Sequence, residues 1–449
     1  MKQTVLVVAI LMSLVWHSAG REILVTKPKD PVYQKYLILT VPEPKPMLKT
    51  GDRLAICGDS ITEQKLYSRI IEDYLTMSTP QLAIEVRQYG WSGERASGFL
   101  RRMTNDCLRF EPTIATTCYG MNDHEYRPYE ERIGMEYREN TQGIVRAFKA
   151  NGVRVVHGAP GCVGKMPHWV KTASGTVEDL NLSLSVLRNI GVQVAADEGV
   201  GFADVFWTML QAGFEGQRLY GTNYAIAGKD GVHPGWAGQV VMAYSFLRAF
   251  GLDGEIGNFS VDLKRHRMRS SAGHSVISEW EGEYELESVR YPFCVCVPAT
   301  NPSPGYPVCG TADPRSDDSI QSAMALVPFQ QELNRFMLVG RNAVAPNYRV
   351  TWGKESKVFT RAQILGGINL AEEFAENPFC EAFAKVDTCV AAKQAFETRQ
   401  VKEVFHGAEG KAHMEAAVSK TEIERAPLAR AIRQAFVPVR HTIRVVPEP

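Results

Sequence analysis

Between Arg53 and Phe250, short apolar segments alternate with longer segments whose apolar residues recur at helical spacing. This alternation restricts the fold more than any other feature, because strands that alternate with helices form a parallel sheet covered by helices. The sequence therefore predicts an α/β domain. Its predicted strands are Arg53–Cys57, Ile84–Gln88, Thr113–Cys118, Val153–Val156 and Val192–Ala195, and its predicted helices are Tyr67–Met77, Glu131–Ala150, Thr176–Asn189 and Trp236–Phe250.

The pattern changes after Gly257. Ser278–Arg290 and Tyr348–Phe359 alternate apolar with polar side chains, which is typical of half-buried strands. From about Leu365 onward, Ala, Glu, Lys and Arg predominate and favour helices. The predicted helices here are Cys380–Phe405 and Ala412–Phe436. The predicted division is a leader of residues 1–20, an α/β domain with its lead-in at 21–255, a β-rich accessory unit at 256–364 and a C-terminal helical segment at 365–449.

The N-terminus has the pattern of a signal peptide. Lys2 precedes the apolar run Val5–Val15, and Ser18-Ala19-Gly20 supplies the small residues of a cleavage site. The alternative is a membrane anchor, but the apolar run is shorter than the ~20 residues that a spanning helix requires. We expect a secreted or periplasmic protein that has no membrane contact after cleavage.

Charge and cysteine content exclude some classes of function. Lys and Arg number 50, as do Asp and Glu, so the chain lacks the basic surface that nucleic acids require. The nine cysteines show no metal-ligand spacing, and we expect no metal and no cofactor. In an oxidising compartment, the stretch Cys294 to Cys309 and the pair Cys380 and Cys389 are candidate disulfides. The odd number leaves the pairing and the oligomeric state open.

Ser60 is the candidate nucleophile. It follows Gly58 and Asp59 directly after the first predicted strand, at the sheet edge where α/β proteins bind ligands. A serine hydroxyl needs a base, and the base needs a carboxylate that orients it. Asp230 and His233 are separated by two residues and supply both groups. Beside Ser60, we expect Asp59 to satisfy turn amides rather than to act in catalysis.

Two further motifs follow the next predicted strands. Gly90-Trp91-Ser92-Gly93 comes after the second strand, and Gly120-Met121-Asn122-Asp123 comes after the third. The tetrahedral intermediate of acyl transfer needs hydrogen-bond donors directed at its oxygen. The backbone amides of Ser60 and Gly93 and the side-chain amide of Asn122 would supply three, while Asp123 would hold its loop.

In this order, the four motifs resemble those of the SGNH hydrolases, also called GDSL lipases and esterases. The resemblance covers about Gly51 to Phe250 and implies a flavodoxin-like three-layer α/β/α fold. It also implies hydrolysis of esters or thioesters without a metal. One departure is Gln88, because many members have Asn a few residues before the oxyanion glycine.

The substrate class is less constrained by the sequence. Candidate substrate-binding residues in the loops are Trp91, Arg95, His124 and Tyr126, in a region whose aromatic rings could stack on sugars. We expect hydrolysis of O-acetyl or similar small acyl esters, with an acylated carbohydrate as the substrate. One alternative is a lipase, phospholipase or thioesterase, which would need an apolar groove for the acyl chain. The other is a catalytically silent polysaccharide-binding protein.

Overall fold

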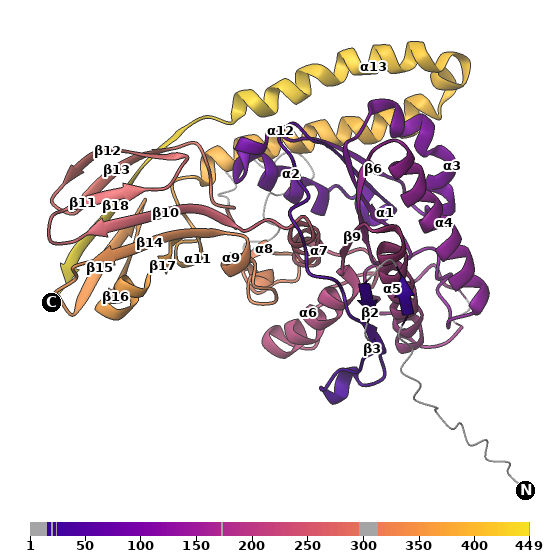
Figure 1. Cartoon of the computed structure of the whole chain (residues 1–449), viewed down its shortest axis with the longest axis horizontal. Coiled ribbons are helices and arrows are strands. Elements are labelled where there is room, and N and C mark those ends of the chain that lie inside the picture. Colours follow the sequence, from indigo (N-terminus) through magenta and orange to yellow (C-terminus); the bar gives the residue numbers. More distant parts are fainter. Residues whose placement is uncertain (1–15, 19–20, 24, 172–173, 296–312, 449) are drawn as a thin grey trace, which may run out of the picture.

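The computed structural model describes residues 16–18, 21–23, 25–171, 174–295 and 313–448. Figure 1 shows an α/β domain, a β-rich unit beside it, and a long C-terminal helix that crosses the α/β domain before the chain ends in the β-rich unit. Most of the predicted leader lies outside the described residues, so its cleavage stays a prediction. No helix in the described part of the chain is long and apolar enough to span a membrane.

A parallel sheet forms the centre of the α/β domain. Among the described residues its strand order is β6-β5-β7-β8-β9, and every neighbouring pair is parallel. This confirms the predicted fold class, and four of the predicted strands agree with the observed ones to within two residues at each end. The strands are β5 (Arg53–Gly58), β6 (Glu85–Gly90), β7 (Ile114–Cys118), β8 (Arg154–Gly158) and β9 (Gly201–Ala203).

The prediction of a strand at Val192–Ala195 is wrong. These residues belong to α5 (Val177–Glu198), which begins with a capping box at Thr176 and ends at Gly199. Helix α5 is buried over much of its circumference, so this apolar run resembles a buried strand in sequence. The last strand of the sheet is β9, which is only three residues long and pairs with β8.

Helices cover both faces of the sheet, which gives three layers. Alternate residues of β5 point to opposite faces. Leu54 and Ile56 lie in an apolar core with α2 and α7, whereas Ala55 and Cys57 lie in a second core with α3 and α4. The helices and short elements of this domain are η1 (Pro31–Tyr33), α1 (Ser60–Glu63), α2 (Tyr67–Met77), η2 (Pro80–Leu82), α3 (Ala96–Asp106), η3 (Leu108–Phe110), α4 (Glu131–Ala150), α6 (Val205–Tyr220) and α7 (Trp236–Ala249), with the lead-in strands β1 (Trp16–Ser18), β2 (Arg21–Ile23), β3 (Val25–Thr26) and β4 (Ile38–Leu39).

The β-rich unit contains two sheets with the orders β11-β10-β14-β17 and β12-β13-β18-β15-β16 in the described residues. Its core includes Phe259, Tyr284, Phe336 and Trp352, all fully buried. The elements are β10 (Glu255–Asp262), β11 (Arg267–Ser270), β12 (His274–Trp280), β13 (Glu283–Ser288), α8 (Ile320–Ala323), α9 (Phe329–Glu332), β14 (Arg335–Arg341), β15 (Asn347–Trp352), β16 (Glu355–Thr360), α10 (Arg361–Gly366), β17 (Ile368–Asn369), α11 (Leu370–Glu373) and β18 (Val439–Glu448).

The C-terminal segment is not helical to its end. Strand β18 lies between β13 and β15, so the last residues of the chain complete a sheet whose other strands begin at His274. His441, Ile443 and Val445 are buried and alternate with more exposed residues, as expected for a strand with one buried face. The last helix of the predicted helical segment therefore ends at Ala435, fourteen residues before Pro449.

Helix α12 (Cys380–Arg399) covers the edge strand β6. Lys393 donates to the carbonyl of Val86 at 2.6 Å, and Glu397 accepts from the amide of Gln88 at 3.2 Å. Gln88, the residue that departs from the family pattern, also donates through its side chain to Thr398. These side chains satisfy edge groups that an unpaired strand would leave exposed.

Cys380 and Cys389, candidates for disulfides in the sequence, do not form one with each other, because Cys389 is a free thiol. Both residues lie on α12, and nine residues of helix separate two Cα atoms by about 13 Å. A disulfide requires Cα atoms within about 7 Å. In the other stretch of candidate disulfide cysteines, Cys294 to Cys309, the residues Cys296 and Cys309 lie outside the described residues.

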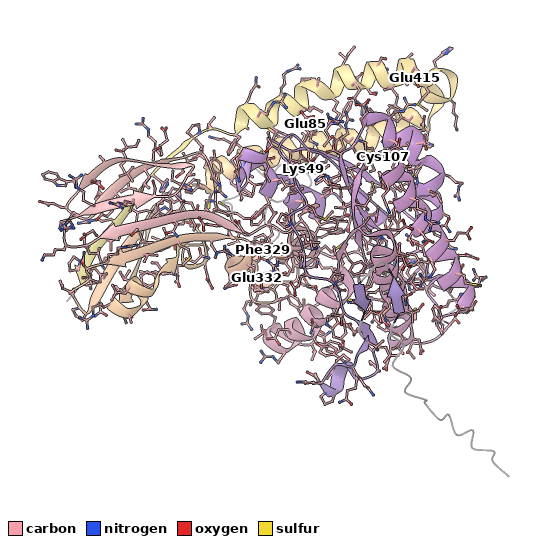
Figure 2. All side chains as sticks on the ribbon, viewed as in Figure 1. Lys49, Glu85, Cys107, Phe329, Glu332 and Glu415 are labelled. Carbon is pink, nitrogen blue, oxygen red and sulfur yellow. The ribbon has the colours of Figure 1, made fainter. Side chains whose placement is uncertain are left out.

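Helix α9 anchors the β-rich unit to the α/β domain, and Figure 2 labels two of its residues at this junction. Phe329 packs against Phe293 and Tyr74, with ring centroids 5.2 and 6.3 Å apart. Glu332 accepts a 2.6 Å hydrogen bond from the hydroxyl of Tyr244 on α7. The two units therefore share both apolar and polar contacts.

Candidate active site

The turn between β5 and α1 places Ser60 at the carboxyl edge of the sheet. Asp59 caps the short helix by accepting a 3.0 Å hydrogen bond from the amide of Ile61. A Cβ atom at Gly58 would lie 2.0 Å from Oγ1 of Thr62, so only glycine allows this turn to close. The amide of Ser60 is the first of α1, which has no carbonyl that can accept from it.

Asp230 and His233 lie in the loop before α7 and reach Ser60. Oδ1 of Asp230 accepts from the amides of Val232 and His233, both at 2.9 Å. Oδ2 lies 2.7 Å from Nδ1 of His233, and Nε2 lies 2.8 Å from Oγ of Ser60. Because the carboxylate accepts the Nδ1 proton, Nε2 carries a free lone pair that can take the proton of Ser60.

The carboxyl group of Asp230 is held in its ionised form. Burial acts to raise its pKa, but the hydrogen bonds from the amides of His233 and Val232 and from the imidazole outweigh burial and lower the pKa below its usual range. An ionised Asp230 can stabilise the imidazolium that forms when His233 takes a proton. The three side chains therefore have the arrangement of a nucleophile, a base and an orienting acid.

The two other motifs lie at the same edge. Gly93 has a φ of 74°, and its amide donates to no protein group among the described contacts. Asn122 donates one amide hydrogen to the carbonyl of Glu94 at 3.0 Å, and its oxygen accepts from the hydroxyl of Tyr126 at 3.2 Å. The second amide hydrogen of Asn122 remains available to a bound oxyanion.

We expect Asn122→Ala to lower kcat by about 10²-fold, because the variant loses one donor to the tetrahedral intermediate. Steady-state kinetics on a small ester would measure this. Tyr126→Phe is the matched control, since it removes the bond to the Asn122 oxygen and leaves the amide nitrogen in place. An unchanged kcat in Asn122→Ala would make this residue part of the loop structure alone.

Two buried carboxyl groups lie beside the motifs. Burial raises the pKa of Asp59 to about 7, and the negative charge of Asp123 contributes in the same direction. Burial also raises the pKa of Asp123 to about 6, although the amides of Ala96 and Gly120 donate to it. These contacts agree with structural roles for both aspartates in their turns.

We expect Asp59→Asn to stabilise the protein at pH 8 and to have little effect near pH 4. The folded pKa lies above the unfolded value of 3.8, so the stability that protonated Asp59 contributes is full below that value and is lost as the pH rises to about 7. With about 1.4 kcal/mol per pKa unit, the gain at pH 8 should be about 4 kcal/mol.

Denaturation at both pH values would measure this gain. Asn keeps an oxygen for the Ile61 amide, and Asp30→Asn at an exposed cap that accepts from Val32 is the control. Equal effects of Asp59→Asn at pH 4 and pH 8 would contradict the account.

Two aromatic side chains, Trp169 and Tyr126, lie on one side of His233. The ring of Trp169 lies 5.6 Å from the imidazole, and the ring of Tyr126 lies 5.9 Å from that of Trp169. Trp169 is 37% exposed, so its ring can contact a ligand. Trp169 is one of the aromatic loop residues that the sequence indicates as possible sugar-stacking rings, although it is not among the four candidate substrate-binding residues. It lies in the loop that follows β8, at the same edge of the sheet.

The other predicted substrate-binding residues lie in different surroundings. Trp91 is half-buried and packs against His406 of the C-terminal segment, with centroids 4.9 Å apart. Arg95 is exposed and forms a 3.0 Å ion pair with Glu125. His124 is fully buried, donates from Nδ1 to the carbonyl of Met121, and has a pKa that burial lowers to about 4. The structure therefore does not bring His124 to the surface of the site.

A cavity of about 450 Å³ lies beside Asp230 and His233. Its lining is mixed: Leu66 and Trp236 are apolar, whereas Gln64 and Lys229 are polar. Asp317 and Asp318 also line it, and they come from the chain beyond the α/β domain. Asp317 accepts from the amide of Ala225 at 3.0 Å, which ties this segment to the site. Nothing in the sequence pattern predicted that Asp317 and Asp318 would line the cavity beside the triad.

These features have the geometry of a serine-hydrolase site on a three-layer α/β/α fold. Residues 56–241 match the model of the GDSL-like Lipase/Acylhydrolase family. This part of the chain is similar to that family, and the match supports an ester-hydrolysing enzyme. No curated protein matches the chain.

One solved structure shares the fold over most of the chain, and others are similar over about half of it. A gut microbial diltiazem-metabolizing enzyme, BT4096, is 20% identical, with a TM-score of 0.71 over 90% of this chain and 100% of its own. A GDSL-like lipase from Parabacteroides merdae is 19% identical and covers 46% of this chain and 99% of its own, with a TM-score of 0.39. An acetylxylan esterase from Geobacillus stearothermophilus is 21% identical and covers 46% of this chain and 96% of its own, with a TM-score of 0.37. The first similarity extends the shared fold beyond the α/β domain.

Proposed function

We propose that this enzyme hydrolyses O-acetyl and similar small acyl esters on carbohydrates through a Ser60–His233–Asp230 triad. The observation that carries the proposal is the continuous hydrogen-bonded relay from Oγ of Ser60 through the imidazole to Asp230, with distances of 2.8 and 2.7 Å. This is the geometry that acyl transfer by serine requires.

In the proposed reaction, His233 removes the proton of Ser60 as Oγ attacks the acyl carbon. The amides of Ser60 and Gly93 and the side chain of Asn122 donate to the oxyanion. The imidazolium then gives its proton to the departing sugar hydroxyl, and an acyl-serine remains. Water, activated by the same imidazole, attacks the acyl-serine and restores the free serine.

The surroundings of the triad support a hydroxyl-rich leaving group. The adjacent cavity presents carboxylates and the amide of Gln64, which can pair with sugar hydroxyls. The ring of Trp169 can stack on a sugar ring. A lipase or long-chain thioesterase would need an apolar groove that starts at Ser60. The apolar cavity of about 420 Å³ beside α13 (Ala408–Ala435) has none of the triad residues in its lining.

We further propose that the protein is exported, with removal of residues 1–20. The support is the N-terminal pattern of Lys2, the apolar run Val5–Val15 and the small residues at 18–20. Sequencing the N-terminus of the mature protein from the cell that makes it would test this. An N-terminus near residue 21 is expected, and retention of Met1 in the mature protein would contradict it.

A panel of esters tests the substrate class. It comprises p-nitrophenyl esters from acetate to palmitate and acetylated xylo-oligosaccharides, each with wild type and Ser60→Ala. We expect acetate release from short esters and from the oligosaccharides, and none from the variant. Preference for palmitate would support the lipase alternative. Binding of the oligosaccharides without release of acyl groups from any ester would support a silent binding protein.

A further inference from the structure

The C-terminal segment contacts the loop that carries Gly93. Glu63, three residues after Ser60 on α1, accepts a hydrogen bond from the amide of Ser92. Lys402 donates to both carboxylate oxygens of Glu63, at 2.7 and 2.8 Å. Lys402 lies in η4 (Gln400–Phe405), a π-helical turn between α12 and α13 (Ala408–Ala435). Such turns are rare and occur frequently at functional sites.

The C-terminal segment also contacts Trp91, the residue before Ser92. The ring of Trp91 has the ammonium group of Lys402 5.3 Å from its centroid and the guanidinium of Arg102 at 5.1 Å. His406 meets the ring edge-on and bonds Asp106 on α3 at 2.8 Å. Lys402 of η4 therefore acts on the segment before Gly93 in two ways, directly at the ring of Trp91 and, through Glu63, at the amide of Ser92.

The pair of Lys402 and Glu63 is shielded enough to be an effective contact. Their side chains are 27% and 20% exposed. Burial acts to raise the pKa of Glu63, but Lys402 and the bonds from Ser92 outweigh it and hold the pKa below its usual range. Without Lys402, an ionised and partly exposed Glu63 would be free to turn to water and release the Ser92 amide.

We propose that Lys402 and Glu63 are positioning residues that set the oxyanion donors relative to the nucleophile. Glu63 shares a single helical turn with Ser60, so its bond to Ser92 fixes the distance between the Ser60 and Gly93 amides. The C-terminal segment thereby sets kcat without touching substrate. This inference rests on the proposed function of Ser60 and Gly93. A displacement of about 1 Å in such groups can cost about 10²-fold in rate.

Lys402→Met tests the inference in the full-length enzyme with p-nitrophenyl acetate. We expect kcat to fall by about 10- to 100-fold, with KM within about threefold, because donors to the transition state move while substrate contacts stay. Lys402→Arg keeps the charge and should recover most of the rate. The control is Lys420→Met, which breaks an exposed pair with Glu409 on the same segment and should leave kcat unchanged.

Rates are expressed per active site. The number of active sites is measured by titration with a fluorophosphonate until labelling is complete, so that loss of folded enzyme does not appear as loss of kcat. A boronic acid that forms a tetrahedral adduct should bind more weakly to Lys402→Met, in proportion to the loss in kcat/KM. Should Lys402→Met fail to fold, Glu63→Gln provides the same readouts, since it removes the ion pair and keeps an acceptor for Ser92.

An unchanged kcat per site, or a rise in KM alone, would overturn the positioning role. These outcomes are distinct from failure of the proposed function, which appears as activity that survives in Ser60→Ala.

Discussion

Ser60→Ala is expected to lower kcat by about 10⁴-fold or more while leaving the fold intact. Ser60 is partly exposed at the start of α1, and its hydroxyl bonds His233 at 2.8 Å, so removing one oxygen creates little packing defect. Steady-state release of p-nitrophenol and a thermal unfolding curve would measure both parts of the prediction.

The matched control for this variant is Ser419→Ala, which removes an exposed hydroxyl from α13 that bonds only its own helix. Its activity should equal that of wild type. Activity of Ser60→Ala within about tenfold of wild type would exclude Ser60 as the nucleophile, because loss of a nucleophile costs far more.

Asp230→Asn is expected to lower kcat by about 10³- to 10⁴-fold. Oδ1 of Asp230 accepts from two amides, Val232 and His233, so the oxygen of an introduced Asn must occupy that position. Its NH₂ group then faces Nδ1 of His233. The imidazole must accept there and carry its proton on Nε2, where it can no longer act as a base toward Ser60.

A control variant sharpens this second prediction. Asp253→Asn changes an exposed aspartate that likewise accepts from a nearby amide, that of Glu255, and should leave kcat unchanged. Near-normal kcat in Asp230→Asn at neutral pH would show that His233 does not depend on this carboxylate for its tautomer.

Much of the α/β domain could be predicted because local patterns determine it. The predicted helices Tyr67–Met77 and Glu131–Ala150 coincide with α2 and α4. The motifs around Ser60, Gly93 and Asn122 each follow a strand of a parallel sheet, so the topology alone brings them to one edge. Their catalytic roles stay predictions until they are measured.

The features of the fold and the site that the sequence did not predict depend on contacts between residues far apart in the chain. Lys402 lies 339 residues from Glu63, and no local pattern links the two. Strand β18 pairs with β13, so its last residues are ordered by strands far earlier in the chain. The run Val192–Ala195 is apolar because α5 is buried, which the sequence alone does not separate from a buried strand.

The measurement that tests the central claim most directly is peptide mapping by mass spectrometry after reaction with a fluorophosphonate ester. The reagent forms a stable adduct with a serine that a neighbouring base activates. The account predicts one adduct, on Ser60, with loss of activity in proportion to labelling and no adduct in the Asp230→Asn protein over the same time. An adduct at another residue, or full activity after Ser60 is labelled, would contradict it.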